Sequence, residues 1–126
     1  MQRILVIDDN PDIQSLVQTL LSRAGYQAFF ATSLAEALAL AEQARPHAVL
    51  VDVARGYHDP AEPLELLRAS RSLRGAPVIA ISGRPDLDQR AALALGYAAF
   101  LAKPFHINSL LAQLRASTGG RLRWLR

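Results

Sequence analysis

Five short apolar runs alternate with longer segments in which apolar residues recur at helical spacing. The first run, residues 4–7, is apolar without interruption and suits a strand that is covered on both faces. This alternation is typical of βα units, in which parallel strands form one sheet and helices cover it. We therefore expect an α/β domain built on a doubly wound sheet.

Local signals locate the individual elements. Asn10 offers an N-cap before Pro11, and the helix that begins there is expected to end at Gly25. Ser33 and Glu36 form a capping-box pattern at the start of the next helix. The expected strands are 4–7, 27–31, 48–51, 77–81 and 98–102. The expected helices are 11–24, 33–44, 61–73, 86–95 and a closing helix from 107 that fades at 118.

Composition limits the function classes. The 126 residues suffice for one hydrophobic core, and they contain neither an apolar run of transmembrane length nor a signal-peptide pattern, so we expect one cytoplasmic domain without a membrane. The absence of cysteine excludes disulfide frameworks and thiolate metal sites, which leaves oxygen or imidazole as metal ligands. The net charge of +3 comes from scattered arginines, which argues against nucleic acid as a partner.

Polar side chains follow the central predicted strands. Asp8 and Asp9 end the first strand, Asp52 the third, Ser82 the fourth and Lys103 the fifth. In a doubly wound sheet, ligands bind at the carboxyl ends of the strands, where these side chains share one edge. A lone aspartate at a strand end is more often a turn former, but an acid group combined with a hydroxyl and an ammonium indicates a site.

The residue types in this group indicate phosphoryl transfer. Three converging carboxylates repel one another unless a cation neutralises them, and oxygen ligands suit Mg²⁺ or Mn²⁺. The carboxylate of Asp52 can attack phosphorus without a separate base, while Lys103 and Ser82 can contact the phosphoryl oxygens. Lys103 is the only lysine beside thirteen arginines, which favours a specific need for a compact ammonium at this position.

These strand-end residues, in this order and spacing, resemble the receiver domain of bacterial two-component response regulators, from residue 3 to about residue 117. The resemblance implies a flavodoxin-like (βα)5 fold with a five-stranded parallel sheet in the order 2-1-3-4-5 and helices on both faces. It also implies that residues 1–118 are the receiver domain and that residues 119–126 are a C-terminal tail or linker.

The resemblance further implies roles for the site residues. A bound Mg²⁺ would be held directly by Asp9 and Asp52, through water by Asp8, and by the main-chain carbonyl of Ala54. A histidine kinase or histidine phosphotransfer protein would phosphorylate Asp52. The chain would catalyse only its own phosphoryl transfer and autodephosphorylation, so it is not expected to be an enzyme with an external substrate.

The same resemblance predicts how the signal leaves the domain. Ser82 and Lys103 would contact the phosphoryl group, and the rotamer of Phe100 would follow Ser82. The face formed by the fourth helix, the fifth strand and the fifth helix would then bind an output protein or fused output domain, or form a homodimer. The residues expected to border the phosphoryl group and to set its lifetime are Ala54, Arg55 and Arg84.

Alternative readings remain open. The segment from Arg55 to Pro63 departs from the family pattern, which leaves a phosphorylation-independent pseudo-receiver that acts as a docking or dimerisation module. A phosphohydrolase is weaker because apolar Val53 and Ala54 follow the nucleophile, and a dinucleotide-binding domain lacks its glycine motif after the first strand. The three histidines have no spacing for a metal site and are interpreted as surface or capping residues: His47, His58 and His106.

Overall fold

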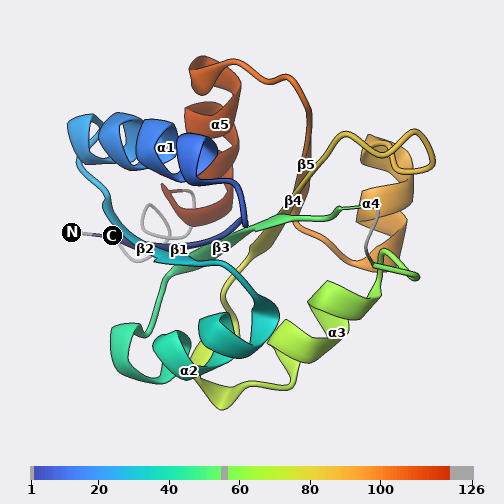
Figure 1. The fold of residues 1–126 in the computed structure, drawn as a ribbon, viewed down its shortest axis with the longest axis horizontal. Coiled ribbons are helices and arrows are strands. Elements are labelled where there is room, and N and C mark those ends of the chain that lie inside the picture. Colours follow the sequence, from blue (N-terminus) through green and yellow to red (C-terminus); the bar gives the residue numbers. More distant parts are fainter. Residues whose placement is uncertain (1, 55–56, 120–126) are drawn as a thin grey trace.

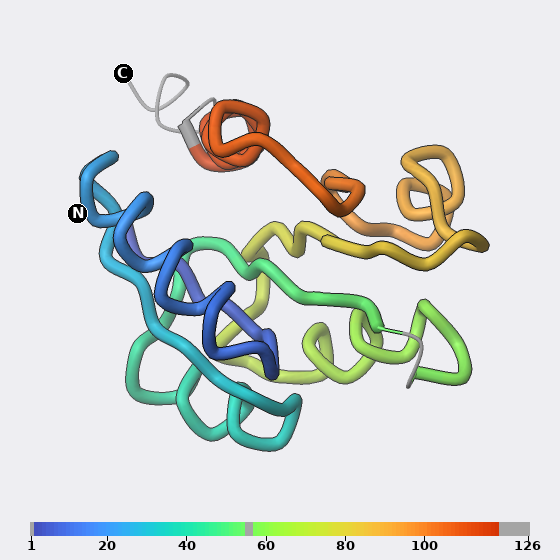
Figure 2. Tube along the Cα trace, turned by 45° about the horizontal axis from the view of Figure 1, so that its top comes forward, coloured from blue at the N-terminus to red at the C-terminus, as the bar shows by residue number. Residues whose placement is uncertain are grey.

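Five parallel strands form the centre of the computed structural model, which describes residues 2–54 and 57–119. The strand order is β2-β1-β3-β4-β5 (Figure 1), so the predicted doubly wound topology is confirmed. The strands are β1 (Arg3–Ile7), β2 (Gln27–Ala31), β3 (Ala48–Asp52), β4 (Val78–Ser82) and β5 (Ala99–Ala102). The end of β3 and the loop after β4 lie on the same side of the molecule (Figure 2), because parallel strands end at one edge.

Helices cover both faces of the sheet (Figure 1). The helices are α1 (Pro11–Arg23), α2 (Leu34–Ala44), α3 (Glu62–Arg68), α4 (Gln89–Leu95) and α5 (Ile107–Leu114), with a 3₁₀ turn at Arg71–Leu73 and a π-helical turn at Arg115–Gly119. Helices α1 and α5 pack on one face, and α2, α3 and α4 pack on the other. Among the described residues, no helix is long and apolar enough to cross a membrane.

The strands are apolar without interruption because both faces bury side chains. In β1, Leu5 and Ile7 belong to the core under α2, α3 and α4, whereas Ile4 and Val6 belong to the core under α1 and α5. All four are at most 3% exposed. Alternating side chains along one strand therefore supply two separate cores, which is why the sequence shows a continuous apolar run here.

The predicted N-caps are present. The Oδ1 atom of Asn10 accepts a hydrogen bond of 2.9 Å from the amide of Asp12, and the hydroxyl of Ser33 accepts one of 3.1 Å from the amide of Glu36. The carboxylate of Glu36 accepts a hydrogen bond from the hydroxyl of Thr32. The predicted capping box is therefore only half formed, since the observed bond to this carboxylate comes from Thr32.

Two helices are shorter than predicted. The expected helix at 61–73 ends at Arg68, where Ser70 adopts an extended conformation before the 3₁₀ turn. The expected helix from residue 86 begins only at Gln89, because Asp88 caps it by accepting a hydrogen bond of 2.8 Å from the amide of Ala91. The third helix begins at Glu62, one residue after the predicted start. Pro63 lies in its first turn, where the missing amide costs nothing because no intrahelical acceptor is available there.

Strand β2 has the predicted bounds, and the boundaries of the other strands differ from the predicted ones by at most one residue. The last two strands begin one residue later than expected, at Val78 and Ala99, and β4 extends to Ser82. In the same way, β3 includes Asp52 as its last residue. Asp52 and Ser82 therefore lie within the sheet itself, and the backbone hydrogen bonds of the sheet hold the main-chain positions of both residues.

Candidate functional site

Three carboxylates meet at the edge of the sheet where the strands end. Asp8 and Asp9 directly follow β1, and Asp52 is the last residue of the neighbouring strand β3. One carboxylate oxygen from each residue lies within 4.8 Å of the others. Because β1 and β3 are paired in parallel, their ends adjoin, and the predicted convergence of the three acids is present in the structure.

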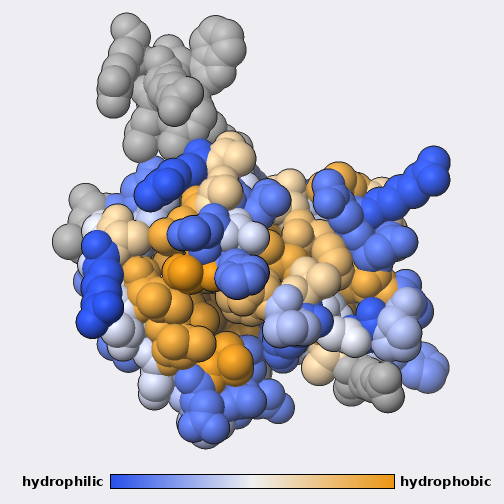
Figure 3. Space-filling model, turned by 90° about the horizontal axis from the view of Figure 1, so that it is seen from above, coloured by the Kyte–Doolittle hydropathy of each residue, from blue (hydrophilic) through white to orange (hydrophobic). Residues whose placement is uncertain are grey.

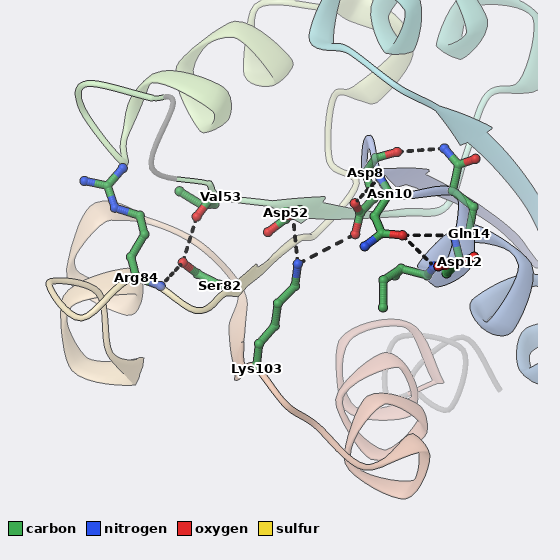
Figure 4. A network of polar contacts seen from close by, with 10 residues as sticks. Asp8, Asn10, Asp12, Gln14, Asp52, Val53, Ser82, Arg84 and Lys103 are labelled. Atoms are coloured by element: carbon green, nitrogen blue, oxygen red, sulfur yellow. Dashed lines mark hydrogen bonds and ion pairs between the residues drawn. The ribbon is translucent and has the colours of Figure 1, made fainter.

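The ammonium of Lys103 enters this group from the end of β5. Its Nζ atom donates a hydrogen bond of 3.0 Å to Oδ2 of Asp52 and lies 3.9 Å from Oδ2 of Asp8 (Figure 4). The side chain of Asp52 is 13% exposed and that of Lys103 is 31% exposed, so water screens the pair only in part. Among the described residues, the ammonium of Lys103 therefore contacts two of the three carboxylates, those of Asp52 and Asp8.

Asp8 is the most deeply buried of the acids, with 6% of its surface exposed. Its Oδ1 atom accepts a hydrogen bond of 2.9 Å from the amide of Asn10, and its main-chain carbonyl accepts one of 2.7 Å from the side chain of Gln14. Burial is the main cause that raises the pKa of Asp8 above its usual value, and the negative charge of Asp52 adds to it. The structure therefore holds a carboxylate where a further positive charge would be favourable.

A cavity of about 280 Å³ opens beside the acids. Its lining residues are Ile7, Asp8, Asp9, Thr32, Asp52, Ala54 and Tyr57. The donor set, three carboxylates beside a small open cavity, fits a hard divalent cation that keeps part of its water shell.

Tyr57 is a part of this cavity that the sequence did not reveal. The side chain is half-buried, and burial together with the negative charge of Asp52 raises the pKa of its hydroxyl. No local pattern marks a tyrosine in a loop as part of a site. Only the folded chain shows that Tyr57 lines the same cavity as the three acids.

Ser82 is 1% exposed, and its hydroxyl already has two partners. It donates a hydrogen bond of 2.7 Å to the carbonyl of Val53 and accepts one of 3.0 Å from the amide of Arg84 (Figure 4). The hydroxyl thus joins the ends of the adjacent strands β3 and β4. The structure places Ser82 at the predicted edge, with its hydroxyl bonded to Val53.

Arg84, two residues after β4, spans the gap to the end of β3. Its Nη1 atom donates hydrogen bonds of 3.1 Å to the carbonyl of Ala54 and 2.6 Å to the carbonyl of Tyr57. Its Nε and Nη2 atoms bind both carboxylate oxygens of Asp86, at 2.8 and 2.7 Å. The sequence placed Arg84 near the site, but these contacts with main-chain carbonyls were not predicted.

The other predicted residues lie further from the acids or outside the described chain. Phe100 is half-buried on β5 and packs against the core under α2, α3 and α4. Arg55 lies outside the described residues. His58 and His106 are exposed, as expected, and Nδ1 of His47 accepts a hydrogen bond of 2.9 Å from the amide of Arg3.

Known proteins include relatives of similar sequence. A family model for the response regulator receiver domain matches residues 4–115. The transcriptional regulatory protein PrrA of Mycobacterium bovis is 33% identical over 115 residues, which cover 90% of this chain and 48% of PrrA. KdpE of Mycobacterium tuberculosis is 36% identical over 118 residues, which cover 93% of this chain and 51% of KdpE. The chain thus spans about half the length of these curated relatives.

Solved structures share the fold. The chemotaxis protein CheY4 of Vibrio cholerae has a TM-score of 0.80 and 27% identity, over 93% of this chain and 98% of that one. The receiver domain of a sensor histidine kinase from Pseudomonas aeruginosa, which has a magnesium ion coordinated in its active-site cleft, has a TM-score of 0.79 and 29% identity, over 94% and 98%. With the family match over residues 4–115, these similarities show that the chain belongs to the response regulator receiver domains, a family of signalling domains in two-component systems.

Proposed function

We propose that the chain is a phosphoacceptor switch of a two-component phosphorelay and that Asp52 receives the phosphoryl group. The observation that carries this proposal is the position of the Lys103 ammonium, 3.0 Å from Asp52 Oδ2, within a group of three carboxylates. Gathering like charges in a partly buried place opposes folding, so such a group is expected where chemistry needs it.

The proposed reaction uses groups that the site already holds. An oxygen of the ionised Asp52 carboxylate attacks the phosphorus of a donor, a P–O bond forms, and the leaving group of the donor departs with the electron pair of the broken bond. Lys103 supplies a fixed positive charge for the phosphoryl oxygens, and Ser82 supplies a hydroxyl donor. Water later hydrolyses the acyl phosphate, so the chain catalyses only its own phosphorylation and autodephosphorylation.

We propose Mg²⁺ or Mn²⁺ as the cofactor. Asp8, Asp9, Asp52 and the main-chain carbonyl of Ala54 are the residues that would hold it. The bound cation would supply positive charge that offsets the acids and the phosphoryl oxygens during transfer. The oxygen donor set and the raised pKa of Asp8 support this assignment, as does the magnesium ion in the Pseudomonas receiver domain.

Signal output is proposed to follow from Ser82. When its hydroxyl turns from Val53 toward a phosphoryl group on Asp52, Phe100 takes the space that is vacated, and the face formed by α4, β5 and α5 changes its affinity for partners. Phosphorylation needs to shift this equilibrium by only a few kcal/mol.

The proposed partners are proteins of the relay. A histidine kinase or histidine phosphotransfer protein donates the phosphoryl group in the cytoplasm, and an output protein or fused output domain receives the signal. A homodimer through the face of α4, β5 and α5 is part of this proposal.

Apolar side chains also gather on the face that carries α1 and α5 (Figure 3), and Leu16 of α1 is 55% exposed. We propose that residues 1–118 act as the receiver domain and residues 119–126 as a tail or linker.

A second candidate is a pseudo-receiver that docks or dimerises without phosphorylation. The observation in its favour is that the carbonyl of Ala54, a proposed metal ligand, already accepts hydrogen bonds from Arg84 and from the amide of Tyr57. A domain that binds no cation would not use Asp52 as an acceptor.

One experiment separates the two functions. Incubation of the protein with acetyl phosphate and Mg²⁺, followed by intact mass spectrometry, is expected to show one phosphoryl adduct in the wild type and none in Asp52→Ala or in EDTA. Asp59→Asn is the matched control, because Asp59 is an exposed acid in the following loop and should leave the adduct unchanged. No adduct on the wild type, or an undiminished one in Asp52→Ala, would reject the switch.

A further inference from the structure

The carbonyl oxygen of Ala54 has both of its acceptor positions occupied. The Nη1 atom of Arg84 donates to it from 3.1 Å, and the main-chain amide of Tyr57 donates to it from 3.2 Å. A carbonyl oxygen has two lone pairs and accepts two good hydrogen bonds. Any further electrophile at this oxygen must therefore displace or weaken one of the two donors.

Of the two donors, Arg84 is the one that can withdraw while keeping its other partners. Its bond to Ala54 is its longest, at 3.1 Å, whereas its bond to the carbonyl of Tyr57 is 2.6 Å and its two bonds to Asp86 are 2.7 and 2.8 Å. The Arg84 side chain is only 9% exposed, so its position is defined by these contacts. A small shift of the guanidinium would free the Ala54 carbonyl.

We propose that Arg84 is an internal cation that competes with Mg²⁺ for the carbonyl of Ala54. This inference rests on the metal site of the proposed function. The guanidinium opposes metal binding in two ways: it occupies a ligand oxygen, and its positive charge lies beside the place where a divalent charge would sit. Metal binding thus requires Arg84 to leave Ala54 and to remain on Tyr57 and Asp86.

The competition also couples the metal to Ser82. The main-chain amide of Arg84 donates to the hydroxyl of Ser82, and that hydroxyl donates to the carbonyl of Val53, next to Ala54. Displacement of the guanidinium therefore loosens a closed set of contacts between the ends of β3 and β4. Arg84 acts here as a positioning residue: it sets how readily the metal binds, and the metal in turn weakens the contacts that hold Ser82 on Val53.

Metal affinity gives the first test. Titration calorimetry with Mg²⁺ is expected to show roughly three- to tenfold tighter binding to Arg84→Ala than to the wild type. This is the gain from removing one long, exposed hydrogen bond that contributes no more than an ordinary one. Arg68→Ala is the matched control, because Arg68 also donates to a main-chain carbonyl, that of Gly96, before the start of β5. Its Mg²⁺ affinity should equal that of the wild type. Equal or weaker binding to Arg84→Ala would overturn the competition.

Salt separates contact from charge alone. Long-range repulsion by Arg84 is screened at high ionic strength, whereas occupation of the Ala54 oxygen is not. The ratio of the two affinities should therefore fall only in part when NaCl is raised and should stay above one. A ratio that falls to one at high salt would overturn the proposed competition for the oxygen.

A second measurement follows the wild type itself and needs a variant only to assign its signals. Guanidinium signals of Arg84 in ¹H–¹⁵N spectra, assigned by their loss in Arg84→Lys, should shift and exchange faster with water when Mg²⁺ is added, while those of Arg68 stay unchanged. Unchanged Arg84 signals at saturating Mg²⁺ would reject the displacement. Absence of Mg²⁺ binding to the wild type and to Arg84→Ala alike would instead reject the metal site of the proposed function, and with it this inference.

Discussion

The ammonium of Lys103 lies 3.0 Å from Oδ2 of Asp52, so the end of β5 is joined by a charged hydrogen bond to the last residue of β3. The same ammonium is 3.9 Å from Oδ2 of Asp8. The strand between them in the sheet, β4, contributes neither partner. A single side chain thus offsets the mutual repulsion of acids from two other strand ends.

Replacing Lys103 by Gln should destabilise the metal-free protein. Among the residues that the structure describes, Lys103 is the cation paired with these acids. We therefore expect a loss of about 1 kcal/mol in the free energy of unfolding, after allowance for screening by water. Mg²⁺ should restore more stability to Lys103→Gln than to the wild type, because it replaces the missing charge. Urea denaturation with EDTA or Mg²⁺ measures both effects. Arg90→Gln, at an exposed position of α4, is the control and should change neither value; a loss that Mg²⁺ leaves untouched would contradict the argument.

Replacing Asp8 by Asn should stabilise the metal-free protein at neutral pH. Burial raises the pKa of Asp8 above 3.8, so the folded state binds this proton more tightly than the unfolded state does. The stability of the wild type therefore falls as pH rises from that unfolded value through the raised folded pKa, and Asp8→Asn lacks this loss. The stability difference between variant and wild type in EDTA should grow from about pH 4 upward and then level off. Urea midpoints across this range test the sign, and a difference that shrinks with rising pH would refute it.

Replacing Ser82 by Ala should leave two main-chain groups without their partner. The carbonyl of Val53 and the amide of Arg84 both bond to the Ser82 hydroxyl in a buried place, so we expect a loss of about 1 to 3 kcal/mol in the free energy of unfolding. Ser82→Thr keeps the hydroxyl and should lose less than Ser82→Ala in the same denaturation experiment. Equal losses in both variants would show that packing, and not the hydroxyl, is what matters there.

Replacing Tyr97 by Phe should weaken the link between the start of β5 and the loop before α3. The Tyr97 hydroxyl donates a hydrogen bond of 2.7 Å to the carbonyl of Pro60, and its loss should cost about 0.5 to 1.5 kcal/mol at neutral pH. Circular dichroism during urea denaturation measures this loss.

The same pair gives a pH dependence. Burial raises the pKa of Tyr97 above its unfolded value of 10.0, so the stability that its neutral hydroxyl contributes is present below pH 10.0 and is lost as pH rises through the higher folded pKa. The stability gap between the wild type and Tyr97→Phe should therefore narrow above pH 10.0. A gap that widens would contradict the assigned burial.

The parts of the fold that the sequence predicted depend on contacts close along the chain. Asn10 before Pro11 predicted the start of α1, because an N-cap side chain accepts hydrogen bonds from the amides two and three residues ahead. The helix predicted from residue 86 was wrong at its start, because Arg84 holds the carboxylate of Asp86 and Asp88 takes the capping position. Asp86 and Asp88 are both acceptable caps by residue type, and the structure shows that Asp88 takes this position while Asp86 binds Arg84.

By itself, the sequence determined the sheet and the meeting of the acids. Parallel strands that are apolar on both faces pair side by side in one buried sheet. Their carboxyl ends, with Asp8, Asp9 and Asp52, therefore share one edge of that sheet. Only the tertiary structure decided where the Ser82 hydroxyl and the Arg84 guanidinium point. Their acceptors, the carbonyls of Val53 and Ala54, are 29 and 30 residues away in the sequence, and such pairings follow from the packing of whole strands and have no local signature.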